Sequence, residues 1–111
     1  MTFVTLFRSP CGWEGFRARG HTGYADHGED IVCAAVSALT QTAVLGLEET
    51  LAIAAEVAIE DGQLSCFLPK FLDQEKWEHG QILLDTVFRG LKAIADEYGQ
   101  FVKVEEVESC G

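Results

Sequence analysis

The chain has 111 residues, with 8 Lys or Arg against 18 Asp or Glu, so its formal net charge is −10 at pH 7. This length fits one domain with a modest core, and a hydrophobic content of 48% is typical of a globular protein rather than a disordered one. The acidity argues against a protein that binds nucleic acid on its own, because phosphate neutralisation needs Lys and Arg, and it favours either a basic partner or a role in solubility.

The first part of the chain predicts two strands, a loop and a helix. Residues 2–8 and 13–20 alternate as strands do, and the turn residues between them predict a hairpin. Three glycines between residues 20 and 30 predict a loop with permissive backbone angles. A helix is expected over about 31–51, with Asp30, or Glu29 one residue earlier, as its N-cap. Its expected apolar stripe comprises Ile31, Ala35, Ala38, Leu39, Thr42, Leu45 and Leu47.

The second part predicts another hairpin and a longer helix. Residues 54–59 and 63–68 are expected to form strands, because Asp61-Gly62 between them is a strong signal for a two-residue turn. The helix is expected to begin after an N-cap at Asp73 and to end near Tyr98. Its apolar stripe comprises Trp77, Leu84, Val87, Phe88, Leu91, Ile94, Ala95 and Tyr98.

The order of the elements predicts the fold class. With a last strand over residues 101–107, the order is ββαββαβ. This order predicts an α+β fold in which a largely antiparallel sheet packs with two helices. Residues 1–111 are expected to form a single domain. No stretch reaches the roughly 18 apolar residues of a membrane-spanning helix, so no membrane span is expected.

The cysteines show no metal-binding or redox spacing. The chain has Cys11, Cys33, Cys66 and Cys110 but no Cys-x-x-Cys, which argues against structural zinc and thioredoxin-type chemistry. No secretory signal precedes them, so free thiols in a reducing cytoplasm are the simplest expectation. Cys66 lies in an apolar strand and is expected in the core, whereas Cys11 and Cys110 are expected to be incidental.

Cys33 is the strongest candidate for chemistry. With Asp30 as N-cap, Cys33 would lie in the first helical turn, where the helix dipole favours the nucleophilic thiolate. His21 lies at the far end of the loop, and a loop hinged at glycines can bring its imidazole to the sulfur. First-turn backbone N–H groups would then form an oxyanion hole. The alternative is that Cys33 is a small buried hydrophobe. The candidate hinges are Gly20, Gly23 and Gly28.

Three nearby polar residues have competing interpretations. His27 is either a second candidate base or a solvated loop residue. Asp30 either orients His21 or caps the helix. Ser37 lies one helical turn after Cys33, where it would either line the site or bond back to the Cys33 carbonyl. A zinc site built on the two histidines and Cys33 would lack a fourth ligand.

A family resemblance rests on the same stretch. Residues 20–25 (GHTGYA) and 28–42 (GEDIVCAAVSALTQT) resemble the ribosomal-processing cysteine protease family, Prp. The resemblance is densest over residues 20–50, and the order and lengths of the other elements extend it over nearly the whole chain. Thr22 stands where the family usually has alanine. Glu29 replaces the basic residues that often follow the loop glycine, which would alter substrate docking.

The resemblance implies an activity and a set of roles. It implies a cysteine endopeptidase of the bacterial cytoplasm that removes the short N-terminal extension of large-subunit ribosomal protein twenty-seven, cutting after a pair of phenylalanines. Cys33 would be the nucleophile and His21 the general base, with Asp30 and Ser37 at positions that the family associates with the site. A mobile loop, here about residues 22–30, would cover the catalytic residues.

The resemblance also implies partners. The expected partners are the ribosomal protein precursor and a second copy of the chain in a homodimer, with no nucleic acid, no membrane, no metal and no organic cofactor. The alternative from another functional class is a non-catalytic acidic module that binds a basic ribosomal partner.

Overall fold

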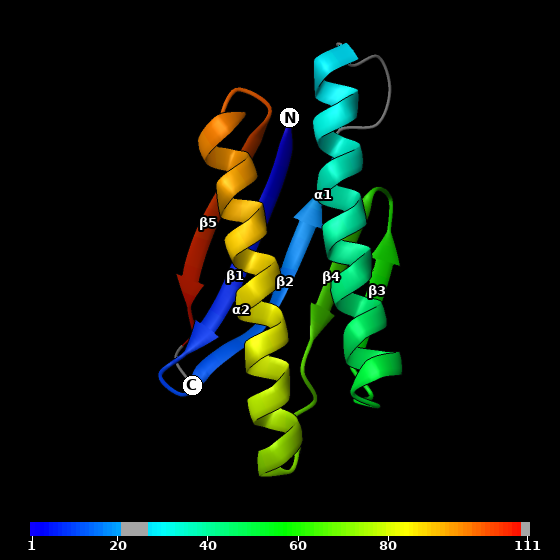
Figure 1. Ribbon diagram of the computed structural model, residues 1–111, viewed down its shortest axis with the longest axis vertical. Helices are drawn as coiled ribbons and strands as arrows, with labels where there is room; N and C mark the ends of the chain where they lie inside the picture. The colour runs from blue at the N-terminus through cyan, green and yellow to red at the C-terminus, as the bar shows by residue number, and fades with distance from the viewer. Residues whose placement is uncertain (21–26, 110–111) are drawn as a thin grey trace.

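The computed structural model describes residues 1–20 and 27–109, and it confirms the predicted order of elements (Figure 1). The hairpins and helices lie where the sequence places them, apart from shifts at their ends. The elements are β1 (Thr2–Ser9), β2 (Gly12–Arg19), α1 (His27–Leu45), a π-helical turn η1 (Gly46–Thr50), β3 (Glu56–Glu60), β4 (Gln63–Phe67), α2 (Gln74–Glu97) and β5 (Val102–Glu108).

The five strands form one mixed sheet in the order β3-β4-β2-β1-β5. Three of its pairings are antiparallel, and the fourth joins β1 and β5 in parallel. The parallel pair exists because α2 carries the chain back along the sheet between β4 and β5, as a crossover connection requires. Both helices cover the same face of the sheet and run antiparallel to each other (Figure 1). The prediction of a largely antiparallel α+β sheet with two helices is confirmed.

The tip of the β3–β4 hairpin is a tight two-residue turn. Asp61 and Gly62 have φ values of 38° and 76°, the positive values that a type I′ turn needs at both positions. The backbone N–H of Gly20 donates a hydrogen bond to the carbonyl oxygen of Gly62 at 3.2 Å. The end of β2 is therefore tied to this hairpin tip.

The start of α1 differs from the prediction. The helix begins at His27, so the predicted N-cap at Asp30 or Glu29 is wrong, and Asp30 lies within the first turn. Carboxylates are favourable in the first turn as well as at the cap, so their presence alone does not locate the helix start. Residues 27–30, expected in a loop, are helical. Gly28 is therefore part of the helix rather than a loop hinge.

The buried face of α1 also differs from the prediction. Val32, Val36, Thr40 and Ala43 of α1 are buried, as is Leu47 in the following turn η1. Most of the predicted stripe faces solvent instead, and only Leu47 is fully buried while Leu39 packs partly against the core. The reason is that α1 is apolar on more than one side, so two different stripes satisfy helical spacing. The exposed members of the predicted stripe are Ile31, Ala35, Ala38, Thr42 and Leu45.

The apolar composition of α1 is relevant to the expectation that no segment of the chain spans a membrane. Residues 30–50 are long and apolar enough to cross a membrane by length and composition alone, with a mean hydropathy of 1.6. Polar residues interrupt this segment, and the expectation that the chain has no membrane span stays a prediction. A core helix of a soluble protein passes it too, and α1 packs Val32 and Val36 into the core.

The core lies between the sheet and the two helices, and the predicted stripe of α2 is largely confirmed. Leu84, Phe88 and Leu91 are buried, whereas Tyr98 is 42% exposed. The ring of Trp13 meets that of Phe88 edge to face, with centroids 4.8 Å apart. Asp73 caps the helix as predicted by accepting a hydrogen bond from the backbone N–H of Lys76 at 2.9 Å.

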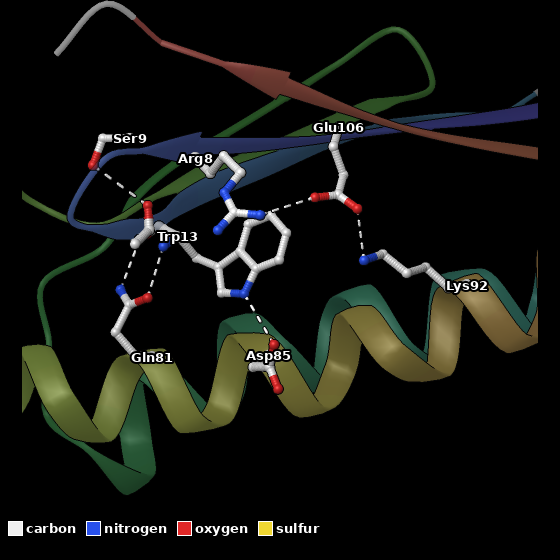
Figure 2. A network of polar contacts seen from close by, with 8 residues as sticks. Arg8, Ser9, Trp13, Gln81, Asp85, Lys92 and Glu106 are labelled. Carbon is white, nitrogen blue, oxygen red and sulfur yellow. Dashed lines mark hydrogen bonds and ion pairs between the residues drawn. The ribbon is translucent and has the colours of Figure 1, made fainter.

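Polar contacts around Trp13 join α2 to the sheet (Figure 2). The Trp13 backbone N–H donates to Gln81 Oε1, and Gln81 Nε2 donates to the Trp13 carbonyl, both at 2.7 Å. The indole N–H donates to Asp85 Oδ1 at 3.2 Å. On β5, Glu106 pairs with Lys92 of α2 at 2.7 Å. These contacts fix α2 over β2 and β5.

Candidate active site

An apolar groove of about 520 Å³ runs between α1 and the β2–β4–β3 side of the sheet. One wall is a single side of α1, and the opposite wall is the β3–β4 hairpin with the ends of β1 and β2. Apart from the thiol of Cys33, none of the described residues that line it is ionisable. They are Thr2, Ala18, Gly20, Cys33, Val36, Ser37, Thr40, Gln41, Val44, Leu45, Val57, Ile59, Gly62, Gln63 and Leu64.

Cys33 lies half-buried on the α1 wall of this groove. Its Sγ is 2.9 Å from the Oγ1 of Thr2, across from it on β1. The position is accessible from the groove, so Cys33 is not simply core filling. The assignment of Cys33 as the nucleophile stays a prediction, and its place on the groove wall is compatible with it.

The helical position of Cys33 differs from the prediction. Because α1 begins at His27, Cys33 is its seventh residue and lies in the second turn. Only the first turn offers unbonded N–H groups and the positive end of the dipole. The predicted thiolate stabilisation by the helix start is therefore wrong, and so is the predicted oxyanion hole of first-turn amides beside Cys33.

Only some of the other predicted site residues line the groove. Ser37 lines the groove one turn after Cys33, and Gly20 lines it immediately before His21 in the sequence. Asp30 is exposed on the first turn of α1 and is not among the lining residues. The predictions for His21 and Gly23 concern residues outside the described part of the chain, and so does most of the predicted loop over 22–30. His27 opens α1, and its side chain is likewise not described.

The other two described cysteines do not line the groove. Cys66 is fully buried, as predicted, and burial, together with the charge of Glu48, raises the pKa of its thiol to about 11. Cys11 is exposed in the β1–β2 turn, and Cys110 lies beyond the described residues. Among the side chains that the structure describes, those of residues 1–20 and 30–109, no group of three or more His, Cys, Asp or Glu could hold a metal ion.

Thr2 is the groove residue that the sequence reasoning missed. It is 3% exposed and belongs to the row of β1 side chains that faces the helices, where Val4 and Leu6 are its buried neighbours. A hydroxyl in an otherwise apolar, core-facing row is the signal that could have marked it, because a buried polar group needs a partner.

The sequence of the chain is similar to those of known proteins. A sequence model of the family described as "Cysteine protease Prp" matches residues 1–103. The chain belongs to the Prp cysteine protease family. It is 33% identical over 96 residues to the "Ribosomal processing cysteine protease Prp" of Bacillus subtilis (strain 168), which covers 80% of this chain and 81% of that relative. The protein is accordingly a cysteine protease, a hydrolase.

Solved structures share the fold. A Streptococcus mutans protein superposes with a TM-score of 0.85 at 26% identity, covering 98% of this chain and 96% of that one. The S. aureus Prp protease, crystallised with a substrate peptide, gives 0.84 at 20% identity and covers 96% and 100% of the two chains. The same S. aureus protease with a covalently linked product peptide gives 0.80 at 21% identity. These Prp structures have the five-stranded α+β architecture described above.

Proposed function

We propose that this protein is an endopeptidase that processes a ribosomal protein precursor. It removes the short N-terminal extension of large-subunit ribosomal protein twenty-seven and cuts after a Phe-Phe pair. The observation that carries this proposal is the thiol of Cys33 on the wall of an apolar groove, in a chain that belongs to a cysteine protease family. The Bacillus subtilis relative, a ribosomal processing protease, supports the same class of substrate.

In this proposal Cys33 is the nucleophile and His21 the general base. His21 accepts the thiol proton, and the thiolate attacks the scissile carbonyl carbon, forming a C–S bond and a tetrahedral oxyanion. The oxyanion collapses, the C–N bond breaks, and His21 protonates the leaving amine. Water then attacks the thioester with the help of His21, which releases the extension and restores the thiol.

The walls of the groove support an aromatic substrate segment. Val36 and Val44 on α1 face Val57 and Leu64 on the hairpin. An aromatic side chain of the substrate that binds between these walls would therefore be removed from water, which is favourable. A volume of about 520 Å³ falls in the range of roughly 300–1,000 Å³ that small-ligand pockets occupy. Ser37 lines the same groove and contributes a hydroxyl one helical turn from the nucleophile.

The charge supports a basic partner. With a net charge of −10, the protein attracts a basic ribosomal precursor and repels nucleic acid at long range. We also propose that it acts in the cytoplasm as a homodimer, without nucleic acid, membrane, metal or organic cofactor. Asp30 is proposed to act near the site from the first turn of α1.

The experiment compares how the wild-type protein and its variants cleave a peptide that carries a Phe-Phe pair followed by a basic segment. Cys33→Ser should abolish cleavage while the fold is kept, because it removes the nucleophile. Cys11→Ser, which removes an exposed thiol outside the groove, should cleave as the wild type does. Mass spectrometry of the products locates the cut. Full activity in Cys33→Ser refutes the catalytic assignment. A peptide that binds wild-type protein but stays intact supports the alternative, an acidic binding module.

A further inference from the structure

The hydroxyl of Thr2 is the polar group that the structure places directly against the thiol of Cys33. Thr2 Oγ1 and Cys33 Sγ are 2.9 Å apart, although 31 residues separate them in the sequence. Thr2 is 3% exposed. The contact therefore lies at the base of the groove, on the sheet side of the thiol.

Thr2 is held in place by the parallel pairing of β1 with β5. Its backbone N–H donates a hydrogen bond to the carbonyl oxygen of Phe101 at 2.8 Å, and it is the register partner of Val102. A β-branched side chain has few χ1 choices, so the backbone fixes where this hydroxyl lies.

A hydroxyl buried at this position needs a hydrogen-bond partner. The other buried side chains in its row, Val4 and Leu6, are apolar, and a hydroxyl buried among them without a partner is unfavourable. Among the described residues, no buried side-chain nitrogen or oxygen lacks a hydrogen-bond partner. The sulfur of Cys33 is the partner that meets this requirement for Thr2.

We propose that Thr2 is a positioning residue for the nucleophile, whose hydroxyl donates a hydrogen bond to the Cys33 sulfur. This bond holds the Cys33 side chain at the groove wall and fixes where its sulfur lies. The inference rests on the proposed role of Cys33. No other ionisable side chain among the described residues lines the groove, so in this part of the site the Thr2 hydroxyl is the group that most directly affects the thiol.

The test follows the alkylation profile of Cys33, which is the fraction of this thiol that iodoacetamide has modified over time at pH 7. Mass spectrometry of the peptide that contains Cys33 separates it from the other thiols. Thr2→Val keeps the shape and removes the hydroxyl that holds the sulfur, so alkylation should slow about tenfold. Thr2→Ser keeps the hydroxyl and should restore the rate to within about twofold of the wild type.

The control is Thr5→Val, which removes a hydroxyl from the same strand on the opposite face of the sheet, near Glu105. It should leave the alkylation profile unchanged. If Thr2→Val does not fold, Thr2→Ala carries the same expectation.

Two results would overturn the inference. One is a folded Thr2→Val protein with the wild-type profile. The other is a Thr2→Ser protein that behaves like Thr2→Val, because the methyl group and not the hydroxyl would then be responsible. Alkylation needs no peptidase activity, so a shifted profile in a protein that cleaves nothing would refute the proposed function and leave this inference standing.

Discussion

Gly15 sets the distance between β2 and β4, and Gly15→Ala should destabilise the protein severely. Gly15 is paired with Phe67 on β4 and with Phe7 on β1. The rings of those two phenylalanines meet above it, with centroids 5.2 Å apart. A Cβ at Gly15 would lie 2.3 Å from the carbonyl oxygen of Cys66 and 2.8 Å from the Cα of Phe67. Both of these atoms belong to backbone, so the contact cannot be relieved by turning a side chain.

The expected loss is at the upper end of the overpacking range, about 3 kcal/mol of unfolding free energy, with a fall in Tm on the order of 10 °C. Urea unfolding followed by circular dichroism measures it. Gly90→Ala is the matched control, because its new methyl group would meet only the side-chain end of Leu39 at 3.3 Å. Alanine favours the helix interior, so this variant should stay within about 1 kcal/mol of the wild type.

A Gly15→Ala protein within about 0.5 kcal/mol of the wild type would refute the reasoning. Such a result would mean that β2 and β4 can separate at little cost. The groove would then lack a rigid floor, because Ala18 and Leu64, which line it, lie on these two strands.

Two further predictions concern charge. Hydrogen bonding to Lys92, and then to Arg8, lowers the pKa of the Glu106 carboxyl, so its contribution to stability is present above the unfolded pKa of about 4.3 and is lost as pH falls through the lower folded pKa. Because these side chains are partly exposed, Glu106→Gln should lower the free energy of unfolding by under about 1 kcal/mol at pH 7 and leave it unchanged near pH 2. Urea unfolding at both pH values measures this difference. An equal loss of stability at the two pH values would contradict the assignment. If the net charge of −10 steers a basic substrate, kcat/KM for the Phe-Phe peptide should fall between low and physiological salt, and a flat salt profile would leave solubility as the role of the acidity.

The sequence predicts α2 better than α1 because the two helices differ in the contrast between their faces. Charged residues occupy the outer side of α2, so one apolar stripe stands out, and Leu84, Phe88 and Leu91 are buried as expected. In α1 the outer side is also apolar, as the 60% exposure of Ile31 shows. Helical spacing alone could not decide between Ile31 and Val32 as the inward residue.

Local structure was predictable where the signal lies in neighbouring residues. The turn at Asp61-Gly62 and the N-cap at Asp73 are of this kind, and both are confirmed. The distance of Cys33 from the helix start could not be predicted in this way, since Asp30 suits the first turn as well as the cap. Thr2 was missed because its partner is 31 residues away, and no local pattern reports such a contact.

The parallel pairing of β1 with β5 has a consequence for the order of assembly. Thr2 is the register partner of Val102. The strand that fixes Thr2, β5, is therefore synthesised about 100 residues after Thr2 itself. Contacts of such long sequence separation form late because closing the loop costs chain entropy. A nascent chain that has already made the β1–β2 hairpin and α1 would still lack the backbone bond from Thr2 to Phe101. The backbone contacts of Thr2, the neighbour of the thiol, are therefore completed only when β5 joins the sheet.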